Sequence, residues 1–167
     1  MAAGMAVTYK IDLVAVEELV AGIVEGFIKK DDLMEIEQCL ENGDRLEAKV
    51  EQIIEDLPTL NISKIIDAIK VMADIVEELP QDLEDCKNIS GDLHKITDWA
   101  QSIDFSKIPG NTLQHLTEIA ADVQKQVADW QTGNYYEVGE TVTDILFLVL
   151  GAPEYRQSPE DATVGLF

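Results

Sequence analysis

Apolar residues recur at every third or fourth position along most of this chain, and this spacing constrains the fold more than any other feature. In the first such segment they are Leu13, Val16, Val20, Ile23, Val24 and Phe27. This period places apolar side chains on one face of an α-helix, whereas a half-buried β-strand requires strict alternation. The sequence contains no alternating run, low-complexity block or internal repeat. The pattern therefore predicts an all-α protein.

Capping residues, prolines and glycines divide the pattern into six predicted helices. They cover approximately residues 12–27, 32–57, 62–79, 90–103, 111–130 and 135–150. We expect the second to be one long helix, although Asn42-Gly43 offers a place for a break. Pro80 is expected to end the third helix. Pro109-Gly110 should close a loop before the fifth, and Gly151 should cap the sixth.

The length of 167 residues is typical of one domain. We expect a single bundle of five or six antiparallel helices over residues 1–167, with an N-terminal arm at 1–11 and an irregular tail at 152–167. Aromatic residues make up only 6% of the chain, so Ile, Leu, Val and Ala must build most of the core. Gly22 and Gly26 lie four residues apart on the first helix and would permit a close crossing with a neighbouring helix.

The charge of the chain excludes several classes of partner. It has 33 Asp and Glu against 12 Lys and Arg, a formal net charge of -21. Phosphate backbones and anionic membranes are bound through Lys and Arg, so we expect neither nucleic acid nor an anionic membrane as a partner. Divalent cations and other cationic partners remain compatible with this surface. The longest apolar run, 145–150, is too short to span a bilayer, so no transmembrane segment is predicted.

The two cysteines, Cys39 and Cys86, lie on the apolar sides of helical segments. They are either two small buried hydrophobic residues or a disulfide, and we favour the disulfide because the count is even and the chain is small. Such a bridge would stabilise the fold by about 3–4 kcal/mol. Two N-glycosylation sequons, at Asn61 and Asn88, point the same way.

A secreted or luminal protein is therefore the favoured prediction. A soluble intracellular protein is the alternative, because cytosolic cysteines stay reduced and no signal peptide is visible in the first residues. The sequons also have a purely structural explanation, since Asn61 and Ser90 stand where helix caps are needed.

Metal and catalytic motifs are not recognised in the sequence. His94 and His115 have Gly91 and Thr112, rather than Glu, three residues before them, which excludes a carboxylate-bridged di-iron site. Acidic residues beside the cysteines would raise a thiol pKa, contrary to what a nucleophile requires. We predict no cofactor, no metal centre and no enzymatic activity. Diffuse calcium binding is conceivable at the densest acidic patches, although a solvated surface is favoured there; these residues are Asp31, Asp32, Glu35, Asp82, Glu84 and Asp85.

Four aromatic residues gather in the C-terminal half: Trp99, Trp130, Tyr135 and Tyr136. Such residues most often belong to a core or a protein interface, because Trp and Tyr combine a large apolar surface with one polar atom. They can also line a pocket for an apolar ligand between helices. The sequence is compatible with a core or interface role and with a ligand pocket for these four residues.

Three parts of the chain carry a resemblance to a known group: the segment from Gly26 to Cys39, the residue Cys86, and the run 134–139 ahead of Gly151. Together they resemble a group of small acidic helical proteins of protists, especially ciliates. The resemblance covers roughly residues 20–151 and consists of two cysteines and a Tyr-Tyr-x-x-Gly turn. It implies a helical fold and export, and it leaves the activity open. We expect a non-catalytic structural or assembly protein that self-associates or joins a larger, extracellular or filamentous, assembly. The alternative is a carrier that binds an apolar small molecule between its helices.

Overall fold

The structure, a computed structural model, describes residues 12–40 and 43–153, and every regular element in these ranges is helical. The α-helices are α1 (Leu13–Ile28), α2 (Leu33–Cys39), α3 (Gly43–Asp56), α4 (Ile62–Asp82), α5 (Ser90–Gln101), α6 (Ile108–Gln114), α7 (Leu116–Gln131) and α8 (Tyr135–Leu150). Three single turns of 3₁₀-helix, η2 (Leu57–Thr59), η3 (Lys87–Ile89) and η4 (Phe105–Lys107), connect them. The prediction of an all-α fold is confirmed.

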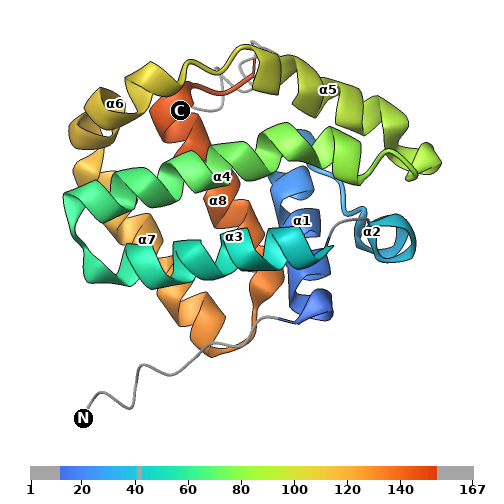
Figure 1. Cartoon of the computed structure of the whole chain (residues 1–167), viewed down its shortest axis with the longest axis horizontal. Coiled ribbons are helices and arrows are strands. Elements are labelled where there is room, and N and C mark those ends of the chain that lie inside the picture. The colour runs from blue at the N-terminus through green and yellow to red at the C-terminus, as the bar shows by residue number, and fades with distance from the viewer. Residues whose placement is uncertain (1–11, 41–42, 154–167) are drawn as a thin grey trace, which may run out of the picture.

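The helices form two layers that cross each other (Figure 1). The antiparallel pair α3 and α4 lies across a layer made of α1, α8 and α7, and α5 and α6 run along one edge. Ile, Leu, Val and Ala supply most of the buried side chains between the layers. Each helix therefore contributes one apolar face to a shared interior, as its sequence period predicts.

The first and last described helices, α1 and α8, make the most extensive contact between helices in the described residues, and their backbones approach closely. A Cβ atom placed on Gly22 would lie 1.9 Å from the backbone oxygen of Tyr136, and one placed on Gly139 would lie 2.0 Å from that of Leu19. Gly26 faces the side chain of Thr143, whose Oγ1 donates a 3.0 Å hydrogen bond to the carbonyl of Ile23. The close crossing expected from Gly22 and Gly26 is confirmed.

The matched positions also give the direction of the two helices. Gly22 meets Gly139 in the first half of the contact, and Phe27 meets Phe147 in the second, with ring centroids 5.0 Å apart. Residue numbers therefore rise together, and α1 and α8 run parallel, whereas α3 and α4 run antiparallel (Figure 1). The predicted arrangement of antiparallel helices thus holds for some pairs and fails for the pair with the most extensive contact.

The structure has eight α-helices in its described residues, against the five or six predicted, because two predicted helices are each divided. The long helix expected over 32–57 is interrupted after Cys39, where the backbone of Leu40 is extended, and α3 starts at Gly43. The helix expected over 111–130 is divided at His115. In both cases the apolar face continues on the far side of the break, so the sequence period does not reveal the interruption.

Two boundary predictions based on proline are also wrong. α4 continues through Pro80 to Asp82, since a proline in the last turn removes little of the helical hydrogen bonding. Pro109 and Gly110 belong to the first turn of α6, where the missing N–H of proline costs nothing. Asn111 consequently does not cap a helix; its amide donates a 2.6 Å hydrogen bond to the carbonyl of Val149 and ties α6 to α8.

Ser90 also does not cap the fourth helix, because it is the first residue of α5 and makes no capping hydrogen bond. Three other predicted boundaries are confirmed. Asp12 caps α1 by accepting a hydrogen bond from the backbone N–H of Ala15, and Asn61 caps α4 in the same way through Lys64. Gly151, with φ of 92°, ends α8. The predicted N-terminal arm lies outside the described residues, as does the predicted tail beyond Pro153.

Candidate functional site

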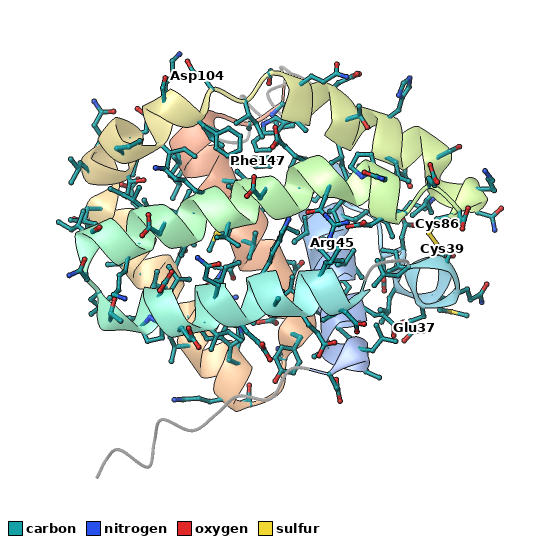
Figure 2. The ribbon with its side chains drawn as sticks, in the orientation of Figure 1. Glu37, Cys39, Arg45, Cys86, Asp104 and Phe147 are labelled. Carbon is teal, nitrogen blue, oxygen red and sulfur yellow. A yellow bond between two sulfur atoms is a disulfide. The ribbon has the colours of Figure 1, made fainter. Side chains whose placement is uncertain are left out.

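The two cysteines meet at one end of the molecule, as their predicted pairing requires (Figure 2). Cys39 ends α2, Cys86 precedes η3, and their Cα atoms are 5.3 Å apart across a sequence separation of 47. This distance is within the range of disulfides. Cys86 is buried and Cys39 is partly buried, so the pair connects α2 to the α4–α5 junction.

Both sequon asparagines are exposed. Asn88 lies in η3, two residues after Cys86, and Asn61 begins α4. The Oδ1 atom of Asn61 accepts the capping hydrogen bond, which leaves the nitrogen that would carry a glycan outside this bond. The capping role and a glycan are therefore compatible at Asn61.

Trp99 is part of a buried aromatic cluster between α1, α5 and α8. Its ring centroid lies 5.0 Å from that of Phe27 and 6.0 Å from that of Phe147, in edge-to-face geometry. Its indole nitrogen donates a 2.8 Å hydrogen bond to the carbonyl of Gly151. These contacts satisfy the only polar atom of the indole and fix α5 against the end of α8.

A pocket of about 490 Å³ opens beside this cluster, between α5 and the end of α8. It is lined by Lys95, Asp98, Trp99, Ser102, Leu150, Gly151, Ala152 and Pro153. The volume is sufficient for a small molecule, and the lining combines an apolar floor with polar groups at α5. A second depression of about 400 Å³ lies on the other side of Phe147, beside Asp122 and Asp144.

The other three predicted aromatic residues lie elsewhere. Trp130 is buried near the end of α7, and Tyr135 and Tyr136 form the first turn of α8, half-buried. Because α8 has 16 residues, its first turn lies roughly 20 Å from the pocket at its other end. The structure thus brings Trp99 to a pocket and does not bring the four residues together.

The predicted acidic patches are only partly solvated. Asp32 and Asp82 are fully buried, whereas Asp31, Glu84 and Asp85 are exposed and Glu35 is half-buried. Within the described residues, no three His, Cys, Asp or Glu side chains form a group that could hold a metal ion. Two pairs of acidic residues interact with each other across neighbouring elements.

The first pair is Asp32, directly before α2, and Asp92 in α5. Lys30 lies between them, with its Nζ 3.7 Å from Oδ1 of Asp32 and 3.5 Å from Oδ2 of Asp92. Neither oxygen of Asp32 accepts a hydrogen bond from a donor group, so a bond to Asp92 requires a proton on one of the two carboxyls. Burial, with the hydrogen bond and charge of Asp92, raises the pKa of Asp32 to about 6, against the opposing effect of Lys30.

The second pair joins α1 to α8 beside the glycine contact. A hydrogen bond with Glu25, together with burial and the charge of Glu25, raises the pKa of Glu140 to about 7. Burial and the carboxylates of Asp31 and Glu25 raise the pKa of the neighbouring Tyr136 to about 12. The N-terminal half of α8 therefore carries two groups, Tyr136 and Glu140, that hold protons more tightly than free side chains do.

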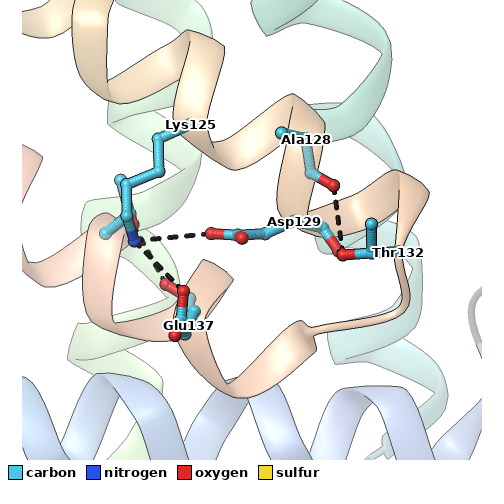
Figure 3. A network of polar contacts seen from close by, with 6 residues as sticks. Lys125, Ala128, Asp129, Thr132 and Glu137 are labelled. Carbon is cyan, nitrogen blue, oxygen red and sulfur yellow. Dashed lines mark hydrogen bonds and ion pairs between the residues drawn. The ribbon is translucent and has the colours of Figure 1, made fainter.

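A third polar cluster, in which one lysine bridges two carboxylates, lies at the α7–α8 turn (Figure 3). The ammonium of Lys125 is 3.5 Å from Asp129 and 3.3 Å from Glu137, and Thr132 donates a hydrogen bond to the carbonyl of Ala128. This network has no reactive arrangement and serves to orient α7 relative to α8.

Sequence reasoning missed Asp92, Glu25 and Glu140. Each is one acidic residue among 33, and its partner is on a different helix, so the sequence carries no local signal for the pairing. The sequence identifies Asp32 only as a possible calcium ligand, and its burial beside Asp92 depends on how distant segments pack together.

Within the described residues, no helix is both long and apolar enough to cross a membrane, in agreement with the sequence-based expectation. Comparison of the chain with protein-family models, with curated proteins and with solved structures finds no match.

Proposed function

We propose that this chain is a non-catalytic structural protein that self-associates through the α3–α4 corner. The observation that carries this proposal is the conformation of Leu60, which joins η2 to α4 with φ of 54° and leaves 54% of its surface exposed. The left-handed region costs a branched L-residue roughly 1–2 kcal/mol. Because the Leu60 side chain is exposed, its burial does not offset this cost within the chain. The strained backbone and the exposed side chain together favour a role for Leu60 in contact with another molecule.

Ile62, two residues later, is 41% exposed, so two large apolar side chains project from this corner. In Figure 1 the corner lies at the end of the molecule opposite α2. With a net charge of -21, copies of the chain repel one another, so association should strengthen as salt screens the charge.

The experiment measures mass by light scattering against protein concentration and salt, for the wild type and for Leu60→Asn. Asparagine tolerates positive φ, so this variant should unfold at higher temperature while its association weakens by about tenfold or more. Met34→Gln, at a residue that is 70% exposed on α2, is the control and should associate like the wild type. A wild type that stays monomeric at millimolar concentration and high salt contradicts the proposal, as does unchanged association of Leu60→Asn.

We also propose that this protein functions in an oxidising compartment, secreted or luminal. The facing cysteines and the two exposed sequons support this location independently of each other. The test is the mass of protein isolated from its source, alkylated without reduction and then treated to remove N-glycans. Two alkylated thiols on the folded protein, with no loss of mass on glycan removal, would favour an intracellular location instead.

The pocket beside Trp99 supports a second candidate function, the transport of a small apolar molecule. The two tryptophans allow a direct test with excitation at 295 nm or above, which selects tryptophan over tyrosine: Trp130→Phe leaves Trp99 as the only tryptophan, and Trp99→Phe leaves Trp130. A bound fatty acid or similar amphiphile should shift emission in Trp130→Phe and leave Trp99→Phe unchanged. Equal responses, or none, with a series of such ligands exclude this candidate.

A further inference from the structure

Helix α2 is attached to the rest of the molecule in an unusual way. It has only seven residues, and a single residue within it, Ile36, is buried. At its C-terminal end, Cys39 faces Cys86 at disulfide distance. At its N-terminal end, the attachment is Asp32, whose side chain is fully buried against α5. Leu33 and Cys39 are partly buried against the core, and α2 also lies against α1, so the carboxyl group of Asp32 is one of a small number of attachments.

The surroundings of Asp32 do not suit an ionised carboxylate. Neither oxygen has a hydrogen-bond donor, and Lys30, the nearest cation, has a side chain that is 58% exposed and therefore largely hydrated. Asp92 of α5 and Glu35 of α2 add negative charge to the same place. A buried carboxylate without donors and beside another carboxylate is strongly disfavoured.

A single proton resolves this conflict. When either carboxyl is protonated, its O–H donates to the other, and the repulsion becomes a hydrogen bond between α2 and α5. When both are ionised, Asp32 is a buried carboxylate without a hydrogen-bond donor, a state that favours its exposure to water. Lys30 lowers this cost without removing it, because it bridges both carboxylates from the solvent side.

We propose that α2 is a pH-dependent element, whose start docks on α5 when Asp32 and Asp92 share a proton and detaches when both ionise, while Cys39 and Cys86 retain its other end. Detachment exposes Ile36 and the adjoining half-buried Leu33. The device therefore presents a small apolar surface near neutral pH and covers it in mild acid.

The sign follows from the titration of Asp32. Its pKa in the docked state is raised, to about 6, so the docked state binds a proton that the detached state releases. The stabilisation of docking is complete below the ordinary pKa of an aspartate and is lost as the pH rises through about 6. The detached state should therefore gain population between pH 5 and pH 8.

Amide hydrogen exchange of the full chain, corrected for the intrinsic effect of pH on exchange, tests this inference. Amides of α2 should be protected about tenfold or more better at pH 5 than at pH 8, while the central turns of α4 and α8 change much less. Asp32→Asn should keep α2 protected at pH 8, because the introduced amide can donate to Asp92 without titrating. Asp92→Asn should also keep α2 protected at pH 8. It provides a second test if Asp32→Asn does not fold.

Asp98→Asn is the matched control, since Asp98 is an exposed carboxylate on the same helix as Asp92. This variant should retain the full pH dependence of the wild type. Equal protection of α2 at both pH values in the wild type overturns the proposal. So does a full pH dependence in both Asp32→Asn and Asp92→Asn, or a loss of protection that is equal in α2, α4 and α8, which would indicate global unfolding.

Discussion

Gly22 and Gly139 are the residues at which a single added methyl group should lower the stability of the fold most. A methyl group at either position would overlap a backbone carbonyl, which is part of a helix and cannot rotate away. We expect Gly22→Ala and Gly139→Ala each to lower the free energy of unfolding by about 3 kcal/mol, at the upper end of overpacking costs. Denaturation by urea, followed by circular dichroism, measures the change.

Gly91→Ala is the control for these variants. Gly91 lies in α5 with open space around the position of a Cβ atom. Because alanine favours the helix, this variant should be unchanged or more stable by up to about 0.5–1 kcal/mol. Equal effects at Gly22 and Gly91 would mean that the α1–α8 contact adapts more readily than its geometry implies.

The sequence predicts one side of this contact but not the other. Gly22 and Gly26 are recognisable because their spacing places both on one helix face. Gly139 stands alone in α8, and nothing local links it to Gly22, which is more than a hundred residues away. The same limit applies to Asp32, whose burial against Asp92 is set by packing between helices.

At the scale of elements, the cysteine pair should determine how firmly α2 is held. The bridge closes a loop of 47 residues, for which the chain-entropy model gives about 4 kcal/mol of stabilisation. Cys39→Ser with Cys86→Ser should lower the stability by up to this amount, with the first loss of amide protection in α2. Wild type treated with a reducing agent should match the double variant; a stability that is insensitive to both would show that apolar packing alone suffices.

Helix existence was predictable here, whereas helix division was not. A break changes the apolar period only if it rotates the next helix away from the core. At Leu40 and at His115 the chain leaves the helix and resumes it with the same face inward, so the apolar pattern continues. Only Asn42-Gly43 gave a local hint of the first break. The second coincides with His115, which is no recognised breaker.

At the scale of the whole molecule, stability should fall as the pH rises from 5 to 8. The pKa values of Asp32 and Glu140 are raised, to about 6 and about 7, and burial raises those of Glu17, Glu18, Glu77 and Asp122 as well. The folded state therefore holds protons that the unfolded state releases, and this stabilisation disappears as the carboxyls ionise. Thermal denaturation at the two pH values should show a higher Tm at pH 5.

Two comparisons identify the source of this pH dependence. Glu140→Gln should narrow the difference in Tm, because the amide can donate to Glu25 at either pH. High salt should remove the share of the Tm difference that arises from repulsion by the net charge of -21. It should leave much of the share that arises from the partly buried carboxyl pairs. A Tm that is constant or rises between pH 5 and pH 8 would contradict these assignments.

The parallel crossing of α1 and α8 also has a consequence for synthesis. Ile23 and Thr143, which are hydrogen-bonded in the folded protein, are 120 residues apart. At translation rates of roughly 5–20 residues per second, roughly 6–24 s pass between the appearance of the two. During that interval the nascent chain carries one of its most apolar segments without the surface that will cover it. A ribosome-bound intermediate stalled before α8 should accordingly recruit chaperones, and it should release them once α8 is available to cover α1.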